Sequence, residues 1–169
     1  LSSNKITRLR FYLIYMVTIA IYCIFWWLLP ITSLVIFLLL SSYHFGESQL
    51  VDYSFKFKKR IIYLFWGFAL LSTLIFYNNN ELLSLSNQFI DTQIFTQVFN
   101  ILIFKYIFYS SNAIVISLLI FENYKLSISN QQLMNEIFLL ILIHVTFYLF
   151  PIIISFTLYF IFLHSIKVL

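Results

Sequence analysis

Three histidines are the residues of this chain whose chemistry is least expected in their surroundings. His44, His144 and His164 each lie within or at the end of a long apolar run. An imidazole at membrane depth is costly unless it is hydrogen-bonded or bound to a metal. Each histidine is therefore a candidate metal ligand. The alternative for any one of them is an imidazole bonded to a backbone carbonyl at a helix end.

His44 and His164 are the stronger candidates. His44 belongs to the stretch SYHFGES at residues 42–48, which contains Gly46, one of only two glycines in the chain. Glycine allows a neighbouring backbone or a ligand to come close. His164 directly follows the apolar and aromatic run at residues 156–163.

The side chains near these two histidines are candidates for supporting roles. Tyr43, Glu47 and Tyr159 could hold an imidazole tautomer through hydrogen bonds. Phe45 and Phe160, with the same two tyrosines, could line an apolar tunnel. The alternatives are interfacial tyrosines, a solvated carboxylate and ordinary packing aromatics.

His144 is the weaker candidate for a metal ligand. It precedes His164 by 20 residues, a rotation of about 200° on a straight helix, so the two cannot share an ion there. We expect His144 to pack within the bundle or to support a ligand from outside the coordination shell.

Several classes of chemistry lack their sequence motifs. The chain has no phosphate-binding glycine loop, GxSxG, HExxH or CxxC motif, and only 6 acidic residues, with no pair at helical spacing. These absences argue against hydrolase, kinase, zinc-protease and thiol-redox functions.

The elements that must position the histidines are apolar helices. The chain is 62% hydrophobic and only 9% charged, far outside the range of soluble domains. Apolar runs at residues 11–29, 31–45, 61–77, 94–121 and 137–163 are long enough to suggest membrane spans, with breaks at Pro30 and Pro151. We predict an all-α, polytopic integral membrane helix bundle of about six transmembrane helices, forming a single transmembrane domain over residues 1–169.

The charges suggest how these spans are oriented. Basic residues cluster at positions 5–10 and 56–60, whereas residues 78–93 carry no Lys or Arg. This pattern is typical of cytoplasmic membrane loops and not of nucleic-acid binding. If Pro151 separates two spans, six spans bring His44 and His164 to the cytoplasmic side at similar depth, where one ion could bind both. With one long kinked helix there, five spans place them on opposite sides.

The two histidine stretches resemble the signature motifs of a known family. SYHFGES at 42–48, and FTLYF at 156–160 followed by HSIK at 164–167, are similar to those of the Brp/Blh family of integral-membrane β-carotene 15,15'-dioxygenases. The resemblance implies a multi-pass protein of the cell inner membrane that uses Fe(II) and O₂ to cleave β-carotene centrally into two retinal molecules. It also implies that His44 and His164 are iron ligands.

Two positions depart from the family pattern. Gln49 stands where family members commonly have Asp, and Val168 stands where many have a further His. An early histidine motif of the family should lie upstream of Leu1. We therefore expect the 169-residue chain to be a fragment lacking that segment, or an inactive homologue.

A non-catalytic membrane protein is the alternative function. It would be a transporter subunit or a carotenoid-binding, degenerate homologue. Matched broken helices and internal symmetry, which transporters often show, are absent from the sequence. The oligomeric state is not predicted by any of these features.

Overall fold

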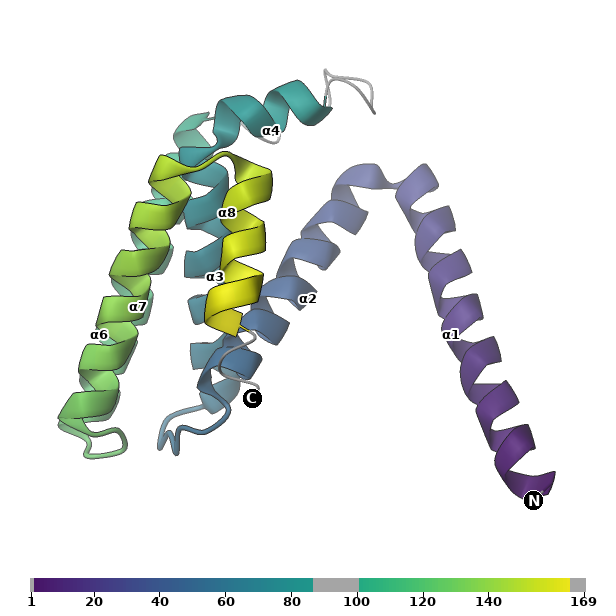
Figure 1. The fold of residues 1–169 in the computed structure, drawn as a ribbon, viewed down its shortest axis with the longest axis horizontal. Helices are drawn as coiled ribbons and strands as arrows, with labels where there is room; N and C mark the ends of the chain where they lie inside the picture. Colours follow the sequence, from purple (N-terminus) through teal and green to yellow (C-terminus); the bar gives the residue numbers. More distant parts are fainter. Residues whose placement is uncertain (1, 87–100, 165–169) are drawn as a thin grey trace. The chain divides into compact units, whose positions relative to one another are not determined.

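The computed structural model describes residues 2–86 and 101–164, with the side chains of residues 10–85 and 103–161. All the elements in these ranges are helical (Figure 1): α1 (Ser2–Leu28), α2 (Pro30–Leu50), α3 (Lys59–Tyr77), α4 (Asn79–Ser86), α6 (Ile101–Tyr124), α7 (Asn130–Leu149), α8 (Ile152–Leu158) and the π-helix η1 (Tyr159–His164). Five of the described helices are long and apolar enough to cross a membrane. The predicted all-α helix bundle is confirmed.

The chain divides into two compact units, residues 1–37 and residues 38–169. Within the first unit, the helix ends at Leu28 and a new one begins at Pro30, as the sequence predicts. Proline begins a helix readily because its missing N–H would have no helical partner there. The Tyr22 hydroxyl donates to the Ser33 carbonyl at 3.2 Å, which links the two helices across this break.

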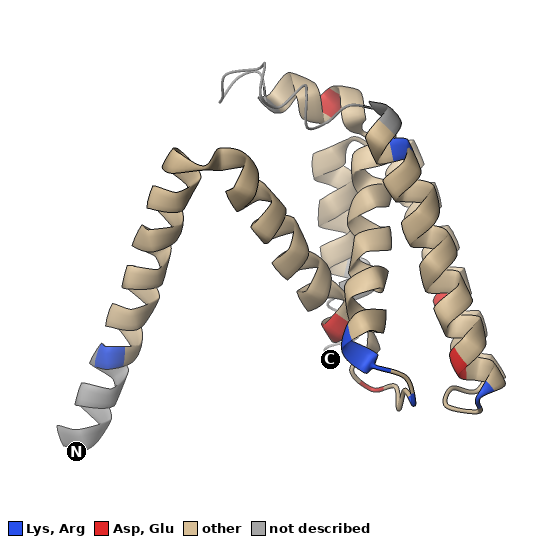
Figure 2. Cartoon of the chain, turned by 180° about the vertical axis from the view of Figure 1, so that it is seen from behind, with Lys and Arg blue, Asp and Glu red and all other residues tan. Residues whose placement is uncertain are grey.

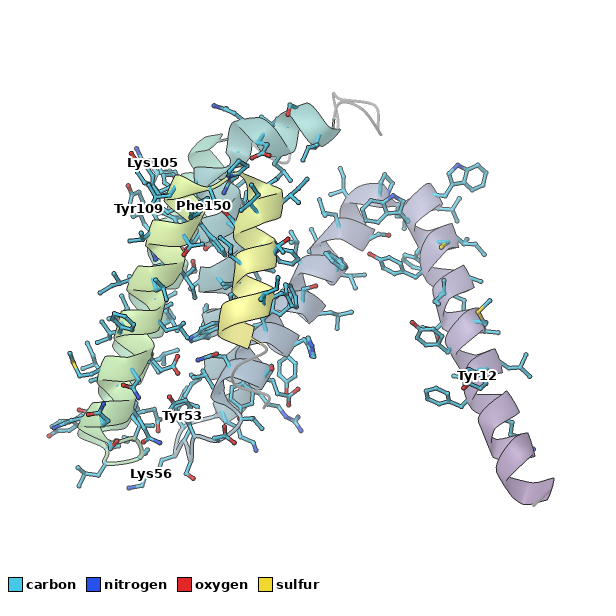
Figure 3. The ribbon with its side chains drawn as sticks, viewed as in Figure 1. Tyr12, Tyr53, Lys56, Lys105, Tyr109 and Phe150 are labelled. Carbon is cyan, nitrogen blue, oxygen red and sulfur yellow. The ribbon has the colours of Figure 1, made fainter. Side chains whose placement is uncertain are left out.

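The second unit is built around α3, whose Ile62, Trp66 and Leu70 are almost completely buried. At one end of the unit, the Lys56 ammonium donates to the Lys125 carbonyl at 2.8 Å. The connections at residues 51–58 and 125–129 therefore lie together, and Lys and Arg positions gather at this end (Figure 2), where Figure 3 labels the Lys56 side chain. Two of the predicted spans, 61–77 and 94–121, separate these connections, so the prediction likewise places both on one side.

The opposite end of the second unit holds the break between α3 and α4 and the break between α7 and α8. The Asn78 side chain donates to the Phe147 carbonyl at 3.1 Å, and the Glu81 carboxylate accepts from the Ile152 backbone N–H at 2.8 Å. α7 ends at Leu149, and Ser155 donates to the carbonyl of Phe150 at 2.7 Å. The chain therefore reverses at Pro151, and the apolar run 137–163 forms a helical hairpin instead of one kinked helix (Figure 1).

Helix boundaries differ from the sequence prediction in two regions of the chain. α2 continues past Phe45 to Leu50, so Glu47 is helical. The expected connection at residues 122–136 shrinks to 125–129, because α6 runs to Tyr124 and α7 begins at Asn130. Both discrepancies arise from polar residues that the helices accommodate through bonds to neighbouring segments.

The two glycines allow α2 and α3 to touch backbone to backbone. A Cβ at Gly46 would overlap the Tyr63 carbonyl, and a Cβ at Gly67 would overlap the Ser42 carbonyl. The pairs Ser42–Gly67 and Gly46–Tyr63 run in opposite chain directions, so the helices are antiparallel. The expectation that Gly46 permits a close approach is confirmed, with the α3 backbone as the neighbour.

The two ends of the second unit should be accessible from opposite sides of a membrane. Ser54 and Ser84 are both exposed and lie at opposite ends of α3. After Cys23→Ala, single cysteines at these positions should react with an impermeant thiol reagent from opposite faces of sealed vesicles. Labelling of both from one face would contradict this transmembrane arrangement.

Candidate functional site

His44 lies on α2 beside a cluster of aromatic side chains. Its own side chain is exposed, whereas the neighbouring Phe45 is buried. The Phe45 ring contacts those of Phe156, Tyr159 and Phe160, with centroid distances of 6.3, 6.0 and 5.6 Å and edge-on geometry. Edge-to-face aromatic contacts of this kind stabilise packing beyond the burial of area alone. The cluster holds the final hairpin helix against α2 at the level of His44.

His164 is the last residue of η1, and its side chain lies outside the described residues. Its backbone follows Phe160, which contacts Phe45 directly. The segments that carry the two candidate ligands are thus packed together, while their pairing on an ion stays a prediction. The π-helical form of Tyr159–His164 is uncommon, and π-bulges occur often at functional sites.

The remaining predicted tunnel residues lie inside the packed core. Tyr159 is almost completely buried, and Phe160 packs on the buried core from its edge. Tyr43 donates to the Glu47 carboxylate at 3.2 Å, a contact between residues one turn apart on α2. The described contacts of Tyr43 and Glu47 are therefore with each other and with Tyr63, whose ring lies 6.2 Å from that of Tyr43.

His144 lies at the other end of the second unit, as a packing residue. Its Nδ1 is 2.8 Å from the Leu140 carbonyl, so this nitrogen must donate, and its ring contacts Tyr77 and Phe108. Tyr77 is 14 residues along α3 from Tyr63, which abuts Gly46. At about 1.5 Å per residue this separation is about 21 Å. His144 is therefore too far from His44 to share an ion with it.

One of the deeply buried polar groups of this unit is a carboxylate that the sequence analysis did not select. Glu136 of α7 is 2% exposed. It accepts hydrogen bonds from the Gln49 amide at 2.9 Å, the Tyr53 hydroxyl at 2.8 Å and the Trp66 indole N–H at 3.2 Å. These donors come from α2, the 51–58 connection and α3, so one carboxylate joins four segments. Three donors compensate much of the cost of burying its charge.

Tyr53 is held in the donating state by this arrangement. Burial, reinforced by the negative charge of Glu136, raises the pKa of the Tyr53 phenol well above its usual value. The phenol therefore keeps its proton at physiological pH and remains a hydrogen-bond donor.

A second buried carboxylate fixes the 51–58 connection. Glu122 is fully buried, and its two oxygens accept from the backbone N–H groups of Lys56 and Phe57, each at 2.9 Å.

The sequence carries a signal that could have located Glu136. Ser129 and Gln132 form a capping box, whose S-x-x-Q spacing marks a helix start. That signal places Glu136 well inside α7.

The described side chains offer one suitable ligand for iron but not a complete set of ligands. Neutral imidazole is a good ligand for ferrous iron, and the exposed His44 is available on a well-packed helix. Within the described side chains, no group of three or more His, Cys, Asp or Glu residues is arranged to hold an ion. His44 could therefore be one ligand of such a site. The other candidate is His164, which ends the segment packed beside the His44 helix.

Comparison with known proteins identifies the family. A model of the beta-carotene 15,15'-dioxygenase family matches residues 1–169. No curated protein and no solved structure matches the chain. The match confirms the resemblance drawn from the two histidine stretches, and it covers α1 to η1 as well as those motifs. The chain therefore belongs to the beta-carotene 15,15'-dioxygenase family.

Proposed function

We propose that this protein is a membrane-embedded, Fe(II)-dependent dioxygenase that cleaves β-carotene centrally into two retinal molecules. The observation that supports this most strongly is the family match over residues 1–169. The packing of the His44 helix against the segment that ends at His164 is consistent with it. The expected location is the cell inner membrane, with β-carotene supplied from the lipid bilayer.

The metal would be held by His44 and His164, with further ligands outside the described side chains. Ferrous iron, when bound, would supply the open coordination positions at which O₂ reacts with the central double bond of the polyene. The two oxygen atoms of one O₂ then appear as the two aldehyde oxygens of the products, so no other oxidant is required.

The chain's own contribution is an apolar environment and fixed helix positions. Many large apolar side chains on α2, α6 and α7 are exposed, including Phe37, Ile114 and Phe138, as expected for helices that face lipid. A hydrocarbon substrate can reach such a surface without leaving the bilayer. The aromatic contacts of Phe45 then keep the two histidine-bearing segments adjacent.

Expression of the complete gene product in cells that accumulate β-carotene tests this proposal. We expect the orange colour to fade and retinal to be detected by chromatography when iron is supplied. Unchanged colour, despite good membrane expression, would instead favour a non-catalytic, carotenoid-binding role.

The metal assignment is tested by histidine variants of the same protein. His44→Ala and His164→Ala should each reduce bound iron and retinal formation by more than the 10–100-fold that loss of an outer-shell partner costs. His144→Ala is the matched control, and should retain most of the iron because His144 lies near Tyr77, far from His44. Iron retained in either of the first two variants would reject that ligand.

A further inference from the structure

A basic hollow lies where α3 begins. Lys58, Lys59, Arg60 and Ile61 line a depression with a volume of about 410 Å³. The three cationic side chains are exposed, and the walls of the depression are formed almost entirely by apolar atoms of these four residues. Because α3 is a candidate membrane span that starts at Lys59, we expect this basic hollow to lie at the depth of lipid headgroups.

The cations of this end of the molecule fall into two groups. The Lys56 ammonium is bonded to the Lys125 carbonyl, and the Lys125 ammonium lies 4.4 Å from the centre of the Phe121 ring. Across the part of the chain that the structure describes, no carboxylate forms an ion pair with Lys58, Lys59 or Arg60. Lys58 and Lys59 are therefore available to an external anion, whereas Arg60 also interacts electrostatically with Tyr43, the partner of Glu47.

The segment leading into the hollow is fixed before any ligand binds. The buried Glu122 carboxylate accepts from the backbone N–H groups of Lys56 and Phe57, immediately before Lys58. A preorganised backbone reduces the entropy lost when the following cationic side chains close on a ligand.

We propose that the basic hollow binds the phosphate of an anionic phospholipid headgroup. Clustered Lys and Arg residues next to a membrane span attract anionic lipids, and each contributes separately to the attraction. Arg60 can engage two phosphate oxygens at once. The apolar stems of the lysines and the Ile61 side chain offer contact to the lipid beyond its phosphate, which inorganic phosphate cannot use.

Native mass spectrometry of the detergent-purified protein can test this site. The probes are short-chain phosphatidylglycerol, short-chain phosphatidylcholine and inorganic phosphate. We expect phosphatidylglycerol to bind in preference to phosphatidylcholine, and millimolar phosphate not to displace it. Lys59→Gln/Arg60→Gln should weaken phosphatidylglycerol binding at least about tenfold.

Two further variants separate the site from general effects. Lys105→Gln/Lys125→Gln removes the same charge from exposed positions outside the hollow, and should bind phosphatidylglycerol as the wild type does. Lys59→Arg/Arg60→Lys conserves charge and should retain binding. Unchanged binding by Lys59→Gln/Arg60→Gln, equal loss in the control, or displacement of the lipid by phosphate would each overturn the proposal.

Discussion

Replacing Glu136 by alanine is expected to lower the free energy of unfolding by about 3–5 kcal/mol. The substitution leaves the Gln49 amide, the Tyr53 hydroxyl and the Trp66 indole N–H without their shared acceptor. Each buried donor that loses its partner costs about 1–3 kcal/mol. The mutant no longer has to bury a charged carboxylate, and this gain offsets part of the cost of the three donors. The expected loss of stability is therefore smaller than three times the cost of one unpaired donor.

A graded series makes this prediction specific. Glu136→Gln keeps the volume and one acceptor oxygen but directs an amide N–H₂ toward at least one existing donor, so we expect an intermediate loss. Glu47→Ala is the matched control, since Glu47 is only partly buried and, within the described part of the chain, its carboxylate accepts a hydrogen bond only from the Tyr43 hydroxyl, at 3.2 Å. Unfolding in detergent, followed by circular dichroism, should rank the three. Equal losses for Glu136→Ala and Glu47→Ala would contradict the role assigned to Glu136.

Replacing Gly67 by alanine is also expected to lower the free energy of unfolding, though by less than Glu136→Ala. An added Cβ would coincide with the backbone carbonyl of Ser42, and a backbone atom cannot move aside as a flexible side chain can. Overpacking typically costs about 1–3 kcal/mol, and here the two helices must separate along their whole contact. The gain of about 1 kcal/mol that alanine brings to a helix interior opposes this loss without cancelling it.

Small-to-large changes elsewhere provide the comparison. Ala113 is exposed on α6, so Ala113→Leu adds more volume than Gly67→Ala but meets no packed backbone. We expect Ala113→Leu to unfold at nearly the wild-type denaturant concentration and Gly67→Ala at a clearly lower one. A Gly67→Ala protein at least as stable as the wild type would rule out the close crossing of α2 and α3.

The sequence predicted the helical architecture well, because that architecture follows from local signals. Pro30 and Pro151 break the apolar runs where the helices end, since neither can continue an i to i−4 ladder. The two apolar runs between the connections 51–58 and 125–129 correctly indicated that both connections lie at one end. These features depend on residues near each other in the chain.

The polar interior was not predicted, because its contacts join distant residues. Gln49 and Glu136 are separated by 87 positions and hydrogen-bond to each other, so neither residue alone indicates that it is buried. Both were assigned to connections on account of their polarity. For His44, the sequence left open whether His164 lies at the same depth, and the packing of Phe45 on Phe160 shows that the segment ending at His164 lies beside it.

The glycine crossing also affects how the protein enters a membrane. α2 has the lowest mean hydropathy of the five candidate spans, and its final turns carry Ser42, His44 and Gln49. Alone in hydrocarbon, it would leave these polar groups facing lipid. Pressed against α3, it hides Ser42, while the buried partner of Gln49 is Glu136 of α7. The two helices and the short turn between them therefore form one insertion unit, which should leave the translocation machinery already paired instead of as two successive spans.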